Sequence, residues 1–254
     1  SAPGSSYEAL ASLESRSLVR FVGRERYELH DTIRDFFGTI LTPAEIRDFG
    51  VLAVSELRTL SEQLIAKGDL VAGVDCLSNA VGLAADPSLK ANLLERLGDI
   101  EARMGDTPAG LVAYREAIGL LATPASLARL HRKTAEALQE RGETSAASVE
   151  IEAAWESLEN RNDVECGWLN LIQSRMSIMS ERWSEGRSRA EAAMNVFRSF
   201  RDVRGQAEAL IELSIVETNA PEGHPDAALK HLLEALRLAR SITEPTVFAD
   251  AQIQ

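Results

Sequence analysis

Apolar residues recur at spacings of three and four along most of the chain from Val51 onward, which is the spacing of one face of an α-helix. The apolar runs come in pairs, and a short turn separates the two members of each pair. Two such runs joined by a short turn predict a helical hairpin. The pattern therefore predicts about five consecutive helical hairpins.

Small residues repeat within these hairpins at a nearly constant step. The predicted turns of the first three units align without gaps, 37 residues apart, at Gly68, Gly105 and Gly142. An alanine ends the pattern of each second helix, at Ala80, Ala117, Ala154, Ala193 and Ala235. Another small residue stands seven positions earlier, at Gly73, Gly110, Ala147, Gly186 and Ala228, and the position between them is filled by Leu77, Tyr114, Ile151, Ala190 and Leu232.

Small residues at a helix crossing let two backbones approach closely, so this stripe predicts the contact between the two helices of each unit. The alternative is a helical bundle whose alanine-rich sequence matches itself by accident, and five regularly spaced occurrences favour the repeat. The predicted units cover residues 51–87, 88–124, 125–161, 162–201 and 202–243, and residues 244–254 are predicted to begin a further helix.

Two predicted helix starts carry a capping pair. Thr42-Pro43 and Thr123-Pro124 place a capping residue before a proline at the first helical position. Residues 42–50 are therefore predicted to be a linker or the start of the first helix.

The first 41 residues carry a different pattern. The stretch LVRFV is followed by a turn at Gly23-Arg24-Glu25-Arg26 and then by YEL, which predicts a small β-hairpin. Helical patterns flank it, YEALASLESRS before and HDTIRDFFGTIL after. A helix, a two-stranded ribbon and a closing helix are typical of the second half of a winged-helix domain, which we predict for residues 1–41.

Composition and charge narrow the function. The formal charge is −12, and 45% of residues are hydrophobic, so the chain is globular and disfavours nucleic-acid partners. Two cysteines provide neither a disulfide framework nor a metal site and suggest a reducing compartment. Every apolar run is shorter than the roughly 18 residues of a membrane span. We expect a cytoplasmic protein without membrane contact, and no spacing of side chains indicates an enzyme.

The hairpins resemble tetratricopeptide repeats over residues 51–254. The second unit resembles that pattern most, with Leu94, Leu97, Gly98, Gly105, Asp106, Gly110, Tyr114 and Ala117. The resemblance implies an all-α fold, a right-handed superhelix of about five helical hairpins, preceded here by a partial winged helix with a small β-hairpin. It also implies a concave groove that binds a peptide or protein.

The opening stretch resembles the end of the winged-helix domain of signal-transduction ATPases with numerous domains, the NB-ARC and maltose-regulon-activator type. The resemblance rests on Leu29-His30-Asp31. It implies that His30 senses ADP bound to an upstream nucleotide-binding domain and that Asp31 caps a helix. The 254 residues contain no G-x-x-x-x-G-K-[S/T] loop, so we expect no cofactor in this chain. The resemblance implies that ATP or ADP binds elsewhere in the parent protein. The alternative is that His30 only caps a helix.

Stacking the units in register predicts which side chains on the first helix of each hairpin face the groove. They are Arg58, Glu62, Asn92, Arg96, Asp99, Arg103, Arg129, Arg132, Lys133, Glu136, Trp168 and Arg175. Arg129 and Lys133 resemble the basic pair of the carboxylate clamp found in some tetratricopeptide domains. The hypothesis is that this strip binds an acidic peptide or a small anionic inducer. The alternative is inter-helix salt bridges with Glu136 and Asp99.

Three functions remain open from the sequence. The favoured one is a non-catalytic binding scaffold that serves as the sensor arm of a signalling ATPase. The second is a DNA-binding transcription regulator with accessory repeats, suggested by Arg16, Arg20, Arg24 and Arg26 around the β-hairpin. The third is a sensor of a small-molecule inducer.

Overall fold

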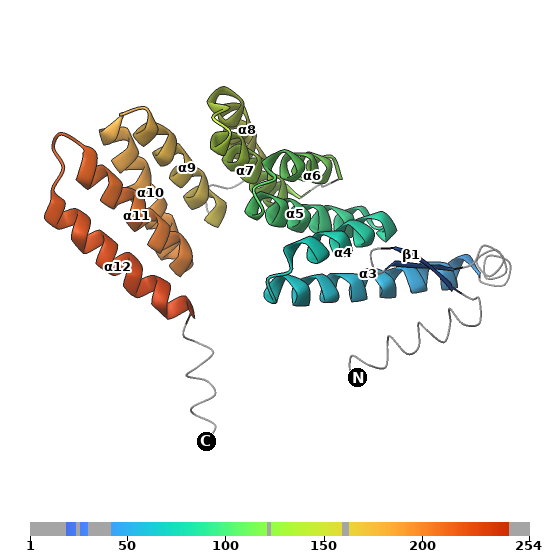
Figure 1. Ribbon diagram of the computed structural model, residues 1–254. Helices are drawn as coiled ribbons and strands as arrows, with labels where there is room; N and C mark the ends of the chain where they lie inside the picture. The colour runs from blue at the N-terminus through green and yellow to red at the C-terminus, as the bar shows by residue number, and fades with distance from the viewer. Residues whose placement is uncertain (1–18, 24–25, 30–41, 121–122, 159–162, 244–254) are drawn as a thin grey trace, which may run out of the picture. The chain divides into compact units, whose positions relative to one another are not determined.

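The computed structural model describes residues 19–23, 26–29, 42–120, 123–158 and 163–243 (Figure 1). The chain divides into two compact units, Ser1–Glu56 and Leu57–Gln254. The division falls inside helix α3, Pro43–Ala66. Helix α3 begins at Pro43, as the Thr42-Pro43 pair predicts, so residues 43–50 of the predicted linker are helical.

The first unit contains an antiparallel pair of strands, β1 (Val19–Gly23) and β2 (Arg26–Leu29). The Cα of Val19 pairs with that of Leu29, and the register shifts between Phe21 and Gly23. The strands lie where the sequence predicts a hairpin. The flanking helices predicted for the winged helix lie outside the described residues, so the winged helix stays a prediction.

The second unit consists of helical hairpins that follow one another along the chain (Figure 1). We call α3, α5, α7, α9 and α11 the first helices, and their successors the second helices. The bounds are α4 Leu70–Leu83, α5 Pro87–Arg103, α6 Thr107–Leu120, α7 Pro124–Glu140, α8 Thr144–Ser157, α9 Val164–Met179, α10 Trp183–Phe200, α11 Val203–Asn219 and α12 Pro225–Thr243. From α4 to α12, each helix contacts the next one along the chain.

Turns inside the hairpins require a left-handed backbone. The three predicted turn glycines, Gly68, Gly105 and Gly142, have φ of 88°, 85° and 77°. This region costs little for glycine and about 1–2 kcal/mol for residues with a Cβ. In the fourth hairpin Glu181 takes the same place with φ of 57°, so the altered turn in the sequence keeps its geometry without glycine.

The predicted small residues lie at the helix crossings. Four of the five closing alanines have no exposed surface, and Ala235 is 5% exposed. Ser61 on α3 donates a hydrogen bond to the carbonyl of Gly73 (2.8 Å), and Ser174 on α9 donates one to the carbonyl of Gly186 (2.8 Å). A short serine side chain reaches the backbone of the second helix because the glycine opposite lets the two helices approach closely. The crossing is therefore built from both helices.

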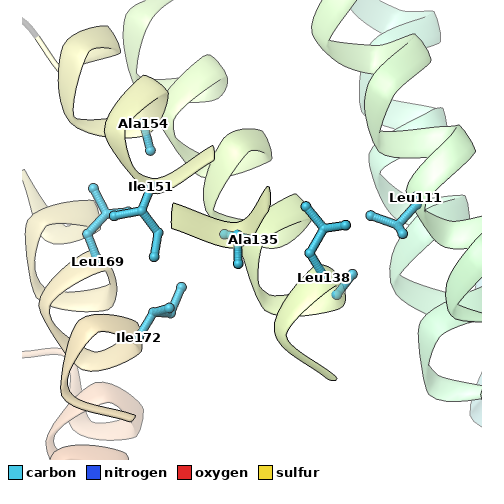
Figure 2. Packing of buried hydrophobic residues seen from close by; sticks show 9 residues of the cluster. Leu111, Ala135, Leu138, Ile151, Ala154, Leu169 and Ile172 are labelled. Carbon is cyan, nitrogen blue, oxygen red and sulfur yellow. The ribbon is translucent and has the colours of Figure 1, made fainter. Parts of the chain in front are cut away.

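Hairpins pack on one another through clusters of buried apolar side chains. Figure 2 shows side chains of α6, α7, α8 and α9 that meet in one cluster. Leu138 of α7 packs with Leu111 of the preceding hairpin, while Ile151 packs with Leu169 and Ile172 of the following one. The apolar stripe of one hairpin is thus covered by the next, as expected for a repeat protein.

A second cluster forms around Phe197 of α10, which is fully buried. Its ring lies edge-on to Trp168 with 4.9 Å between ring centroids. Glycines of the two adjacent first helices lie against the ring. A Cβ added at Gly167 or Gly205 would lie 2.6 Å from Cε1 of Phe197, closer than real carbon contacts allow.

The last helix departs from the predicted stripe. The sequence pattern predicts Leu232 at the packed position between Ala228 and Ala235, but it is 46% exposed, so this prediction is wrong. In the earlier hairpins the next first helix also covers the second helix. Among the described residues α12 has α11 on one side only, and it turns Ala228, Ala235 and Leu238 toward that helix.

Replacing Gly205 by alanine should destabilise the protein by about 1–3 kcal/mol, because the new Cβ would overlap the buried ring of Phe197. Gly119→Ala is the control, since a Cβ there meets nothing within 4 Å and should leave stability equal or slightly raised. Urea unfolding followed by circular dichroism measures both. Adding Phe197→Leu to Gly205→Ala should restore part of the loss, and equal stability of the two alanine variants would contradict the proposed clash.

Candidate functional site

A charged groove lies across the first helices α5, α7, α9 and α11, with a volume of about 1170 Å³. Seven cationic and four acidic side chains line it, in a protein whose formal charge is −12. The lining residues are Arg96, Asp99, Arg103, Tyr114, Arg129, Arg132, Lys133, Glu136, Gln139, Glu140, Trp168, Arg175, Met179, Arg204 and Glu208.

The central helix of this groove is α7, where Arg129, Arg132 and Lys133 fall within five positions. Arg129 and Lys133 are four residues apart and share one side of the helix, whereas Arg132 is offset from them. Their salt-bridge partners differ accordingly. Arg129 and Lys133 reach α5, and Arg132 reaches α9. One helix therefore supplies cations to both of its neighbours.

Two bidentate ion pairs connect first helices at a step of 34 residues. Arg96 of α5 donates from Nε and Nη2 to the carboxylate of Glu62 on α3, at 2.8 and 2.7 Å. Arg129 of α7 donates in the same way to Glu95 of α5, at 2.7 and 2.9 Å. Two parallel hydrogen bonds fix orientation as well as distance, so each pair sets how one hairpin sits on the next.

Lys133 belongs to a small network beside these pairs. Its Nζ contacts both oxygens of Asp99 at 2.6 and 2.7 Å and Glu95 at 2.8 Å. The hydroxyl of Tyr114 donates to Asp99 at 2.8 Å. Burial and the neighbouring Asp99 carboxylate both raise the pKa of Tyr114, so the phenol stays protonated and acts as a donor.

The pKa of Glu95 shows how strongly these cations act. Burial alone raises the pKa of this carboxyl, yet its hydrogen bonds and charge interactions with Arg129 and Lys133 bring the pKa below its usual value. Glu62 also has a lowered pKa, chiefly because Arg96 donates to it. The carboxylates of these two pairs are therefore held ionised.

Up to α7 the earlier first helix supplies the carboxylate and the later one the cation. After α7 this order is reversed. Arg132, which is 8% exposed, donates from Nε to Glu165 of α9 at 2.7 Å and from Nη1 to Glu136 at 3.0 Å. Burial lowers the pKa of Arg132, but the two carboxylates outweigh burial and hold the pKa above its usual value. Arg175 of α9 then donates to Glu212 and Glu208 of α11, at 2.6 and 2.9 Å.

Trp168 of α9 lies between two arginines. The guanidinium carbons of Arg132 and Arg204 are 5.4 and 5.7 Å from its ring centroid, which is within the range of cation–π attraction. Arg132 is buried in its ion pairs, whereas the side chain of Arg204 is 76% exposed and lies 3.2 Å from Glu208. The indole therefore joins the buried charges to an exposed one.

Comparisons with known proteins extend the picture. No protein-family model matches the sequence, and no curated protein matches it. Several solved structures share its fold. The crystal structure of aspartyl phosphate phosphatase F from Bacillus subtilis is 13% identical with a TM-score of 0.66, covering 96% of this chain and 63% of that chain. BtubC (BKLC) from P. vanneervenii is 15% identical with a TM-score of 0.61, covering 93% and 92%.

A third structure names the repeat directly. It is a signal transduction ATPase with numerous domains that carries a tetratricopeptide repeat sensor, from Pyrococcus horikoshii, 16% identical with a TM-score of 0.56. The alignment covers 93% of this chain and 40% of that one. The helical hairpins have a tetratricopeptide-like fold. At these identities the likeness concerns the fold alone.

Nine of the twelve side chains predicted to face the groove of this tetratricopeptide-like unit do line it. The other three, Arg58, Glu62 and Asn92, are not among its lining residues. Of the inter-helix salt bridges left open as an alternative, the one with Asp99 is present, from Lys133 of α7 to α5, whereas Glu136 pairs with Arg132 inside α7. The predicted basic strip is therefore largely neutralised from within. His30 and Asp31 lie outside the described residues.

The clamp-like pair is occupied by the chain's own carboxylates. Arg129 and Lys133, which resemble a carboxylate clamp in sequence, bind Glu95 and Asp99. The prediction named Asp99 and Glu136 as acidic partners and missed Glu95. The signal was present in the sequence, because acids and bases of opposite charge stand 34 residues apart at Glu62 and Arg96, at Glu95 and Arg129, and at Asp99 and Lys133.

The sequence pattern also misses other lining residues. It assigns Tyr114 to packing alone, although the hydroxyl of Tyr114 reaches the groove network. The other residues that it misses lie toward the ends of α7, α9 and α11, where the aligned repeat pattern predicts side-chain positions least well. They are Gln139, Glu140, Met179, Arg204 and Glu208. Among the residues the structure describes, no three histidine, cysteine or acidic side chains form a cluster able to hold a metal ion. None of the described helices is long and apolar enough to cross a membrane.

Stability should fall with acid through these ion pairs. Because the pKa of Glu95 is lowered by folding, its stabilising effect is complete above the unfolded pKa of about 4.3 and is lost as pH falls through the folded pKa. We expect the melting temperature to drop as pH falls below about 4.3. Glu95→Gln should cost about 1–3 kcal/mol at pH 7 and make that acid drop smaller.

The matched control is Glu152→Gln, an exposed glutamate of α8 with no salt bridge among the described residues. It should keep both the neutral stability and the acid drop of the wild type. Differential scanning calorimetry from about pH 7 to pH 3 measures all three proteins. A Glu95→Gln variant that behaves like this control would show that the pair contributes nothing to folding.

Proposed function

We propose that the helical-repeat unit is a non-catalytic protein-interaction scaffold and that its groove binds an extended, acidic segment of a partner protein. The observation that carries this proposal is the groove itself, a continuous charged surface shared by four first helices. The tetratricopeptide-like fold supports it, because repeats that contact only their neighbours present long surfaces to extended partners.

The size and the lining of the groove favour a polypeptide over a small molecule. Small-molecule sites are usually clefts of about 300–1,000 Å³ lined mainly by apolar side chains. This groove has a volume of about 1170 Å³, and eleven of its fifteen lining residues are charged. The exposed cations Arg103 and Arg204 stand on different helices, α5 and α11, so an extended peptide can meet both along its length, whereas a small anionic inducer would meet one of them.

The charge of the groove favours an acidic partner. Seven cations face four acids there, although most of the cations already pair within the chain. Two arginines are the least engaged. Arg103 is exposed and has no salt bridge among the described residues, and Arg204 is 76% exposed. A partner carboxylate can pair with these two without breaking the ion pairs between hairpins.

The test reverses the charge of both exposed arginines. A fluorescein-labelled peptide of alternating glutamate and serine should bind the wild type at low salt, and Arg103→Glu/Arg204→Glu should weaken binding at least tenfold. Fluorescence anisotropy measures the dissociation constant. These substitutions are better suited than Arg129→Ala/Lys133→Ala, which would also break the contact between α5 and α7.

Lys67→Glu/Arg115→Glu is the matched control, because both residues are exposed, lie outside the groove, and give the same change in net charge. It should reduce binding only slightly. If the two double variants lose the same affinity, attraction is a general charge effect and the groove proposal fails. Tight binding of duplex DNA with strong salt dependence would instead favour the regulator hypothesis.

We further propose that this chain is the sensor region of a signal-transduction ATPase with numerous domains. Two observations support this. The β1–β2 pair is followed immediately by His30-Asp31, which belongs to the motif of that family. The fold is also shared, over 93% of this chain, with a protein of that class from Pyrococcus horikoshii. In such a protein, partner binding by the repeats would shift the ATPase between its states.

The test uses the gene and the protein it encodes. We expect a G-x-x-x-x-G-K-[S/T] loop encoded upstream of Ser1 in the same reading frame. In the full-length protein, His30→Ala should weaken ADP binding at least tenfold, whereas His131→Ala, in the repeats beside Glu150, should leave it unchanged. Isothermal titration with ADP measures both, and the absence of an upstream loop would refute the proposal.

A further inference from the structure

Helix α12 has two apolar faces. One face packs on α11 through Ala228, Ala235 and Leu238. The other face carries four leucines with 46–57% of their surface exposed, which are Leu229, Leu232, Leu233 and Leu236. Single exposed leucines are ordinary, but four at positions i, i+3, i+4 and i+7 form one continuous apolar stripe.

The preceding hairpins show what such a stripe contacts. The residues equivalent to Leu232 are Leu77, Tyr114, Ile151 and Ala190, and these are between 0% and 4% exposed. The equivalent of Leu229 in α6 is Leu111, which is 3% exposed and lies in the cluster that joins α6 to α7. A helix covers this side of the second helix in the earlier hairpins, so a helix is the shape that fits Leu229 and Leu232. The residues equivalent to Leu233 are polar and exposed, Ser78, Arg115, Glu152 and Glu191, so the apolar face of α12 is wider than the one that the earlier hairpins cover.

We propose that the leucine stripe of α12 is an interface between two copies of this chain, with the two α12 helices packed antiparallel. The spacing of the stripe is the first argument. The order leucine, two residues, two leucines, two residues, leucine reads the same from either end. An antiparallel pair therefore places Leu229 against Leu236 of the second copy and Leu232 against Leu233, with every leucine matched.

The charges on the same face are the second argument. Asp226 in the first turn and Arg240 in the last turn each lie seven residues from Leu233, on the same line along the helix. Antiparallel packing brings Asp226 of one copy close to Arg240 of the other, twice per pair. Parallel packing would place like charges together at both ends. The dipoles of the two helices also oppose in the antiparallel arrangement.

The stripe covers little more than two helical turns, so the expected interface is smaller than the roughly 1,200 Å² of a stable specific interface. The dimer should therefore be weak, with monomer prevailing at about 1 µM and dimer detectable at about 200 µM. This inference does not depend on the groove or on its partner.

Sedimentation equilibrium of the 254-residue chain from about 1 to 200 µM tests the proposal. The wild type should dimerise reversibly, and Leu233→Glu should weaken association at least tenfold, because it places two carboxylates in the apolar centre. Leu83→Glu is the control, since Leu83 is 52% exposed at the end of α4 and this variant should dimerise like the wild type. Circular dichroism should show both variants fully folded.

The antiparallel direction of the two α12 helices is tested by disulfide trapping, in a chain whose Cys76 and Cys166 have been replaced by serine. Mixing Leu229→Cys with Leu236→Cys should give mixed disulfides in excess over the two homodimers. A wild type that stays monomeric at about 200 µM overturns the proposal, and so does a dimer that Leu233→Glu leaves intact. If only a chain truncated after Thr243 associates, the stripe is covered by residues 244–254 of its own chain, which also overturns it.

Discussion

The contact between first helices through paired charges is the interaction on which the groove depends. If only apolar side chains meet, two neighbouring hairpins can pack in many orientations, because the hydrophobic effect is not directional. Bidentate pairs such as Arg129 with Glu95 have direction, since two parallel hydrogen bonds allow one orientation. The paired side chains that line the groove therefore also set its form, and Arg129 or Lys133 cannot be changed without altering the stacking of hairpins.

This double role determines where the groove can bind. A partner that competed for Arg129 or Lys133 would have to replace a carboxylate that is already in place, at little net gain. Exposed cations at the helix ends offer charge without that cost, as Arg103 does. The buried charges position the groove, and the exposed ones are left for recognition.

Much of the fold follows from the sequence, because small residues at a fixed step and turn glycines such as Gly68 are typical of repeated helical hairpins and of few other folds. The sequence predicts which faces of the first helices line the groove, and nine of the twelve predicted side chains do line it. The electrostatics of the groove were predicted only in part. The pair of Lys133 with Asp99 was one of the alternatives, whereas the pairs of Glu62 with Arg96 and of Glu95 with Arg129 are found only when residues 34 positions apart are compared. The prediction for Leu232 failed for a related reason, because a repeat pattern cannot show whether a neighbouring helix covers it.

The order of charges across α7 makes the hairpins non-interchangeable. Before α7, each first helix offers an acid to its successor, as Glu62 does to Arg96. After α7 the order reverses, and Arg132 offers a base to Glu165. A duplicated hairpin copied from the amino-terminal arm would fit beside its source, but after α7 it would set cation against cation. Lengthening of such an array by gene duplication is therefore confined to each arm separately.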